Sequence, residues 1–104
     1  MNSPRRSVRV AESFFEQLDA QLGPNREADG SPSATDFLVF ELPTVVERFA
    51  EDYSSLPETV DGVTGGRMLI ASGLLVRYFV VFALLATDGG IDLVGIKSSR
   101  RPKI

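Results

Sequence analysis

The stretch Met68–Ala86, MLIASGLLVRYFVVFALLA, decides the fold, because nineteen almost wholly apolar residues suit either a membrane-spanning helix or strands of a sheet. A helix of this length would just span a hydrocarbon core of about 30 Å. It would place Arg77, its one charged residue, near the bilayer centre at a cost of about 3 kcal/mol. It would also contain Gly73, which lowers helix propensity, and several valines, which favour strands over helices. The stretch therefore predicts strands, and we expect no membrane partner.

The flanking residues divide this region into three consecutive antiparallel strands. The first break falls at Ser72-Gly73, and a TDGG segment, residues 87–90, separates the long run from a second apolar run, IDLVGI. Asp-Gly between strand-like runs is a strong hairpin signal, because glycine accepts a positive φ without strain. The predicted strands are Gly66–Ala71, Leu74–Ala86 and Ile91–Ser98. The middle strand is apolar on both faces, as expected if helices cover one face and a partner or loops cover much of the other.

The start of the chain predicts a short strand and an amphipathic helix. The segment SVRV places Val8 and Val10 on one face of a strand. A helix is predicted over AESFFEQLDAQLG, before Gly23-Pro24 ends it. Its core-facing residues recur at a spacing of four: Phe14, Leu18 and Leu22.

A second amphipathic helix is predicted after Ser33, which forms a capping box with Asp36. Pro43 lacks an amide hydrogen, so we expect the helix to be kinked or broken near it. Its apolar positions recur at three and four: Leu38, Leu42, Val45, Phe49 and Tyr53. The phenylalanines expected in the core are Phe14, Phe37, Phe40 and Phe49. The acidic residues expected on solvated faces, rather than at a cation site, include Glu41, Glu47, Glu51 and Asp52.

These elements together predict an α+β fold with two layers, in which helices pack on one face of a mostly antiparallel sheet. The order is a short N-terminal strand, two helices and three strands. At 104 residues the chain is long enough for one modest core, so residues 1–104 are predicted to form a single domain.

The composition excludes several kinds of chemistry. The chain has no cysteine and no histidine, which removes disulfides, thiolate metal sites, thiol nucleophiles and the usual general base. No cofactor or metal is expected. The N-terminus has arginines but no uninterrupted apolar run behind them, so no secretory signal is expected and the cytoplasm is the predicted location.

The net charge of −3 hides an uneven distribution along the chain. Residues 1–10 hold Arg5, Arg6 and Arg9 and no acid, whereas residues 11–64 hold twelve acids and two arginines. Residues 65–104 hold six basic residues against Asp88 and Asp92. Two surfaces of opposite sign are therefore expected. The N- and C-terminal basic residues would form one patch only if the fold brought them together.

Several features of the second half resemble the RelE/ParE superfamily of toxins from type II toxin–antitoxin systems. They are the strand with Arg67, the segment GLLVRYFVVF, the TDGG turn, the strand IDLVGI and the terminal KSSRR. The order of elements matches that fold along nearly the whole chain. RelE-like members cleave mRNA in the ribosomal A site, whereas ParE-like members inhibit DNA gyrase, and a cognate antitoxin neutralises both.

The resemblance implies roles for specific basic residues. Arg77 matches the arginine that contacts the scissile phosphate in RelE-like enzymes, and Lys97, Arg100 and Arg101 match the basic run that commonly holds a catalytic arginine. Arg67 lies where a basic residue often lines the nucleic-acid site. Cations of this kind can stabilise the charge of a pentacoordinate phosphate without histidine.

Other readings of these residues stay open. In a regular strand Tyr78 would point away from Arg77, and Arg77 can instead lie along the sheet and pair with an acid such as Asp92. The C-terminal tyrosine common in RelE-like enzymes is missing, because only PKI follows Arg101.

Three functions are therefore predicted. The first is a RelE-like toxin that inhibits translation by ribosome-dependent mRNA cleavage, with the ribosome, mRNA and an antitoxin as partners. The second is a ParE-like toxin that inhibits DNA gyrase. The third is a non-catalytic relative that only binds an antitoxin-like partner.

Overall fold

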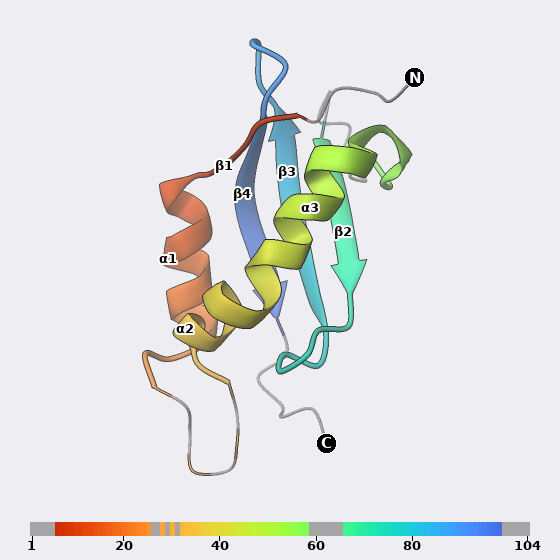
Figure 1. Cartoon of the computed structure of the whole chain (residues 1–104). Helices are drawn as coiled ribbons and strands as arrows, with labels where there is room; N and C mark the ends of the chain where they lie inside the picture. Colours follow the sequence, from red (N-terminus) through yellow and green to blue (C-terminus); the bar gives the residue numbers. More distant parts are fainter. Residues whose placement is uncertain (1–5, 26–27, 29, 31, 59–65, 99–104) are drawn as a thin grey trace.

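The computed structural model of the chain describes residues 6–25, 28, 30, 32–58 and 66–98. The N-terminal half of this region contains β1 (Val8–Val10), α1 (Glu12–Gln21), the single turn α2 (Ala34–Asp36), a π-helical segment (Phe37–Glu41), α3 (Leu42–Asp52) and a 3₁₀ turn (Tyr53–Ser55). The C-terminal half contains β2 (Gly66–Ala71), β3 (Phe79–Leu85) and β4 (Ile91–Ser98). Figure 1 shows α3 lying across one face of the sheet and α1 lying beside β4.

The strands of the described residues form a four-stranded sheet in the order β1-β4-β3-β2. The last three strands along the chain pair antiparallel, and β1 pairs parallel to β4 at the edge. Residues 57 and 58 cover part of the opposite edge, where the Met68 amide donates to the Pro57 carbonyl at 3.0 Å. This arrangement confirms the predicted two-layer α+β fold.

The apolar stretch Met68–Ala86 forms β2, a loop and β3, and no helix among the described residues is long and apolar enough to cross a membrane. The predicted bounds of β2 and β4 are confirmed. The predicted strand Leu74–Ala86 is wrong at its start, because the strand begins at Phe79. The residues before it form a loop whose amides bond to a side chain of the helical layer, as described below, and so cannot join the sheet ladder.

The predicted Asp-Gly turn joins β3 to β4. Gly89 has a φ of +85°, a conformation that glycine adopts without strain. The Ala86 amide donates to the Gly90 carbonyl at 2.8 Å, and the Gly89 amide donates to the Ala86 carbonyl at 3.0 Å. The hairpin register then places Leu85 opposite Ile91.

The core lies between the helices and the sheet. It contains Phe14 and Leu18 of α1 and Leu22 at the end of that helix, as predicted, and Val8 and Val10 of β1 pack against it. The sheet contributes the side chains that point toward the helices: Leu69, Phe79, Val81, Ala83, Ile91, Leu93 and Ile96. Phe37 joins the two layers, because its ring meets the Phe79 ring edge-on at a centroid distance of 5.0 Å.

The second helix is made of joined pieces, which agrees with the predicted break near Pro43. The Ser33–Asp36 capping box is present in both directions. The Leu42 amide then donates to the Phe37 carbonyl in the π-helical pattern, and Pro43 lies in the first turn of α3.

The buried stripe of this helix has a spacing of four residues. Its members are Phe37, Glu41, Val45, Phe49 and Tyr53, none more than 5% exposed. The predicted core position of Phe40 is therefore wrong, because this side chain lies off the stripe and is 46% exposed. The predicted solvated position of Glu41 is also wrong, since the same spacing places it inside.

A row of polar side chains on α1 caps the part of β4 that extends beyond β1. Ser13 donates to the Val94 carbonyl at 2.7 Å, and Gln17 accepts from the Ile96 amide at 3.0 Å. Gln21 donates to the Ile96 carbonyl and accepts from the Ser98 amide, both at 2.6 Å. The spacing of four residues places all three side chains on one face of α1, where they satisfy backbone groups that a neighbouring strand would otherwise bond.

Candidate functional site

Arg67, on β2, points into the helical layer and holds the segment before the strand. Its guanidinium donates to the Leu56 carbonyl at 2.9 Å and lies 3.5 Å from the Glu58 carboxylate. It also lies over the Tyr53 ring, 5.8 Å from the centroid. These contacts engage its two terminal nitrogens, whereas its buried Nε has no partner among the described residues.

Arg77 and Tyr78 lie in the loop between β2 and β3 and both are exposed. The guanidinium stacks on the neighbouring ring, 5.6 Å from its centroid. The two side chains thus point the same way, whereas a strand would have separated them. The alternative pairing of Arg77 with Asp92 is also wrong, because Asp92 accepts a hydrogen bond from Arg9 at 2.8 Å instead.

Lys97 is exposed on β4, where its pairing partner in the sheet is Val80. The register places it at the same end of the sheet as the loop that carries Arg77. The other two predicted site residues, Arg100 and Arg101, lie outside the described residues. Among the described cations, therefore, Arg77 and Lys97 share one end of the sheet, and Arg67 is turned away into the helical layer.

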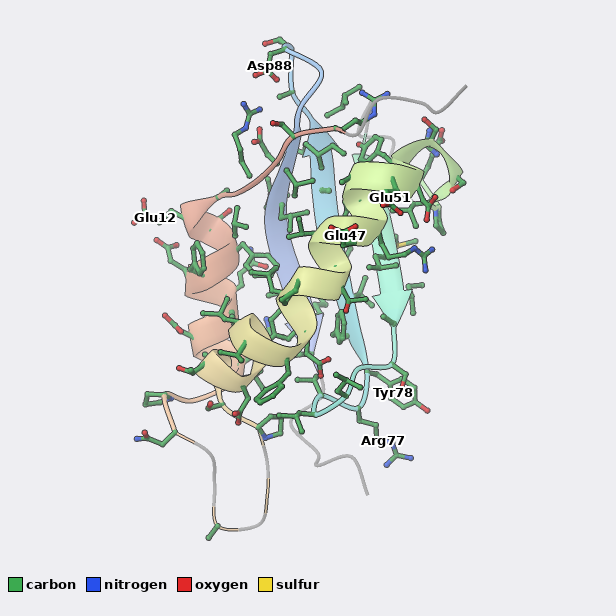
Figure 2. All side chains as sticks on the ribbon, in the orientation of Figure 1. Glu12, Glu47, Glu51, Arg77, Tyr78 and Asp88 are labelled. Atoms are coloured by element: carbon green, nitrogen blue, oxygen red, sulfur yellow. The ribbon has the colours of Figure 1, made fainter. Side chains whose placement is uncertain are left out.

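The N-terminal arginines that the structure describes do not join Lys97 in one basic patch. Arg9 pairs with Asp92, five residues before Lys97 on β4, which corresponds to about 16 Å along the strand. Arg6 donates to the Gly89 carbonyl at 3.0 Å, in the turn at the same end as Arg9. Figure 2 shows Asp88 of this turn and Arg77 at opposite ends of the molecule.

Arg9 is instead part of an exposed ionic cluster with two carboxylates. It lies 2.8 Å from Asp88 and 2.8 Å from Asp92. The hydrogen bond from Arg9, with help from the Gly90 amide, lowers the pKa of Asp88 to about 2. The same two carboxylates raise the pKa of Arg9 above its usual value. With one arginine and two aspartates, the cluster carries a net charge of −1.

A polar cavity of about 770 Å³ lies beside Tyr53, between the end of α3 and the β3–β4 turn. The guanidinium groups of Arg6 and Arg67 each lie 5.8 Å from the Tyr53 centroid. Burial raises the pKa of the Tyr53 phenol, and the two arginines partly offset this effect. Glu51, Asp52 and Asp88 also line the cavity, so its wall has more acidic than basic groups and does not suit a phosphate.

A second, more apolar groove of about 440 Å³ lies between α3 and the edge strand β2. Val45, Leu69 and Phe79 form its floor, and Ile70 and Leu74 line its rim. The rim residues are 63% and 69% exposed. Leucine and isoleucine so open to solvent next to a groove are typical of a protein-contact surface.

The end of this groove is fixed by Glu41, which is only 3% exposed. Its carboxylate accepts hydrogen bonds from three successive amides of the β2–β3 loop, those of Leu74, Leu75 and Val76, each at 2.8 Å. Gly73 must be a glycine here, because a Cβ would overlap the carboxylate. The sequence analysis placed Glu41 on a solvated face, although its spacing of four residues from both Phe37 and Val45 indicated a buried position.

The face of the sheet opposite the helices carries a second apolar surface, which we call the open face. Its apolar side chains alternate with the core residues of the same strands and do not pack against the core. They are Met68, Ile70, Val80, Phe82, Leu84 and Val94. No helix among the described residues covers them (Figure 1).

A scan against protein-family models and searches of curated proteins and of solved structures found no match. The resemblance to the RelE/ParE superfamily therefore stays a prediction from the sequence. Among the described residues, no group of three acidic side chains is arranged to hold a metal ion.

Proposed function

We propose that this chain is the toxin of a type II toxin–antitoxin system and that it acts in the cytoplasm by protein contact, as ParE-like members act on DNA gyrase. The observation that carries the proposal is the apolar groove between α3 and β2, with Leu74 69% exposed on its rim. The Glu41 carboxylate holds the backbone of this rim in place. A preformed apolar groove favours an apolar protein segment, because binding there requires little ordering of the receptor.

The positions of the basic residues support contact rather than cleavage. Cleavage of RNA without histidine requires several cations around one phosphate. Arg67 is bonded to the Leu56 carbonyl within the helical layer, and Arg6 and Arg9 lie at the other end of the sheet from Lys97. Arg48 pairs with Asp52 on α3 at 3.2 Å, which leaves Arg77 and Lys97 as the described cations that could share a phosphate.

Ribosome-dependent mRNA cleavage is the second candidate. Two features favour it. Arg77 and Lys97 are both exposed at one end of the sheet, and Lys97 begins the basic run Lys97–Arg101 of the sequence. In this case Arg77, Lys97, Arg100 and Arg101 would stabilise the phosphate, and the ribosome and mRNA would be the partners.

Inducing the chain in bacterial cells separates these functions. The variants are Leu74→Lys at the groove, Leu85→Lys as an exposed leucine at the other end of the sheet, and Arg77→Ala combined with Lys97→Ala. We expect the wild type to cause growth arrest with DNA damage and to inhibit purified gyrase. We expect Leu74→Lys to lose both effects, whereas Leu85→Lys and the double alanine variant keep them.

Other outcomes point elsewhere. Loss of translation with cuts in the ribosomal A site, abolished in the double alanine variant, would replace the proposal by mRNA cleavage. Normal growth on induction of the folded wild type would contradict a toxin and leave a non-catalytic relative that binds an antitoxin-like partner.

A further inference from the structure

The open face is a small grid of side chains arranged in three rows across the sheet. The central row contains Met68 and Phe82, with Val94 at the β-bulge of β4 beside them. One outer row contains Leu84, Asp92 and Arg9. The other outer row contains Ile70, Val80 and Lys97. Six apolar side chains thus lie between an ionic cluster at one end and a lysine at the other.

The edges of the sheet are less accessible than this face. Ser13, Gln17 and Gln21 of α1 occupy the backbone groups of β4 beyond β1. At the other edge, residues 57 and 58 pair with the first half of β2. Strand addition is therefore hindered along part of both edges, whereas the open face as a whole carries no covering helix among the described residues.

The charges on the open face complement those of a second copy. The cluster of Arg9, Asp88 and Asp92 has a net charge of −1, and Lys97 makes no ion pair with another described residue. A two-fold axis that relates two such copies can lie in the interface, perpendicular to the strands, and pass through the row that contains Phe82. Rotation about this axis exchanges the two outer rows. Lys97 of each copy then faces the acidic cluster of the other copy.

We propose that the open face binds the open face of a second copy of this chain, forming a two-fold symmetric dimer. The Phe82 side chains pack against each other near the axis, and Val80 packs against Leu84 of the other copy. Two ion pairs between Lys97 and Asp92 close the ends of the interface. The groove between α3 and β2 shares Ile70 with this face, but the test of the proposed function uses Leu74, which lies outside the open face, so the two proposals can fail separately.

The size of the face predicts a weak dimer. Three strands of six to eight residues about 4.8 Å apart, together with the three-residue β1, give a footprint of roughly 20 × 20 Å, or about 400 Å², on each copy. The total of about 800 Å² is smaller than that of standard specific interfaces, so we expect a dissociation constant in the high micromolar range.

Sedimentation equilibrium across a dilution series through the micromolar range tests the proposal. We expect the wild type to approach twice the chain mass of 11.3 kDa at high concentration. Each of two single substitutions, Lys97→Glu or Asp92→Lys, places like charges opposite one another across the interface. Each should therefore raise the dissociation constant at least about tenfold. An equimolar mixture of the two variants should form a heterodimer as tight as the wild-type dimer, because every pair is again complementary.

A monomeric wild type at all these concentrations overturns the proposal. A dimer that neither charge reversal weakens, or a mixture that associates no better than its components, overturns the assignment to this face. Phe82→Asp should abolish the dimer, and Val39→Asp, an exposed residue of the helical layer, should not. If Phe82→Asp loses its circular dichroism spectrum, the mixing experiment still decides, because Lys97 is exposed and Asp92 is only half-buried.

Discussion

Replacing Glu41 by glutamine should destabilise the whole domain, although the two side chains have the same shape. The carboxylate accepts from the amides of Leu74, Leu75 and Val76, with one bond to Oε1 and two to Oε2. Glutamine has a single acceptor oxygen, so at most two of these bonds persist, without the contribution of the charge. If the amide oxygen takes the place of Oε2, the partly buried Leu74 amide then faces an NH₂ group.

The magnitude follows from these three bonds. A hydrogen bond to a charged group contributes about 1.5–3 kcal/mol and a neutral one about 0.5–1.5 kcal/mol, and an unsatisfied buried donor costs about 1–3 kcal/mol. The two bonds that persist each lose about 1 kcal/mol with the charge and the third is lost at about 1.5–3 kcal/mol, so Glu41→Gln should lower the free energy of unfolding by about 3.5–5 kcal/mol. At about 4 °C per kcal/mol for a domain of this size, the Tm should fall by roughly 14–20 °C.

Urea unfolding followed by far-UV circular dichroism measures this change, and Glu16→Gln is the control. Glu16 is exposed on α1, so the same chemical change there should alter the stability by less than about 0.5 kcal/mol. A loss below about 1 kcal/mol for Glu41→Gln, with an unchanged slope in urea, would refute the assigned role of the buried carboxylate.

Three further predictions concern other contacts. Gly73→Ala should destabilise about as much as Glu41→Gln by urea unfolding, because its Cβ overlaps that carboxylate; a neutral effect would contradict the close approach. An NMR titration should find the pKa of Asp88 near 2 and, in Arg9→Gln, closer to its usual 3.8. Because this pKa is lowered on folding, the contribution of the pair to stability is present above pH 4 and lost as the pH falls toward 2; an Asp88 midpoint near 3.8 in the wild type would contradict the pairing. Gln17→Ala removes one bond to the edge of β4 and should cost about 1–2 kcal/mol, with faster amide exchange in that strand; unchanged exchange would show that the bond contributes little.

The fold was largely predictable because its elements carry local signals. The bounds of β2 and β4 and the turn at Gly89 follow from apolar runs and from the φ that an Asp-Gly turn requires. The helix before Gly23 follows from its spacing of four residues. These signals lie within a few residues of the structure that they specify.

The start of β3 and the position of Arg77 were not predictable in the same way. Leu74 and Leu75 look like strand residues, but their amides bond to Glu41, more than thirty positions earlier in the chain. A contact between residues so far apart in the sequence leaves no periodic pattern of apolar residues near residue 74. The candidate site was correspondingly less predictable, since Arg77 was placed in a strand and occupies a loop.

The pairing of β1 with β4 and the bonds from α1 to β4 join residues about 75 to 83 positions apart. During synthesis the N-terminal strand and helix therefore leave the ribosome long before the strand that completes them exists. They must wait for their partner in the sheet until β4 has also emerged, so this domain completes folding only after the residues through β4 have been translated.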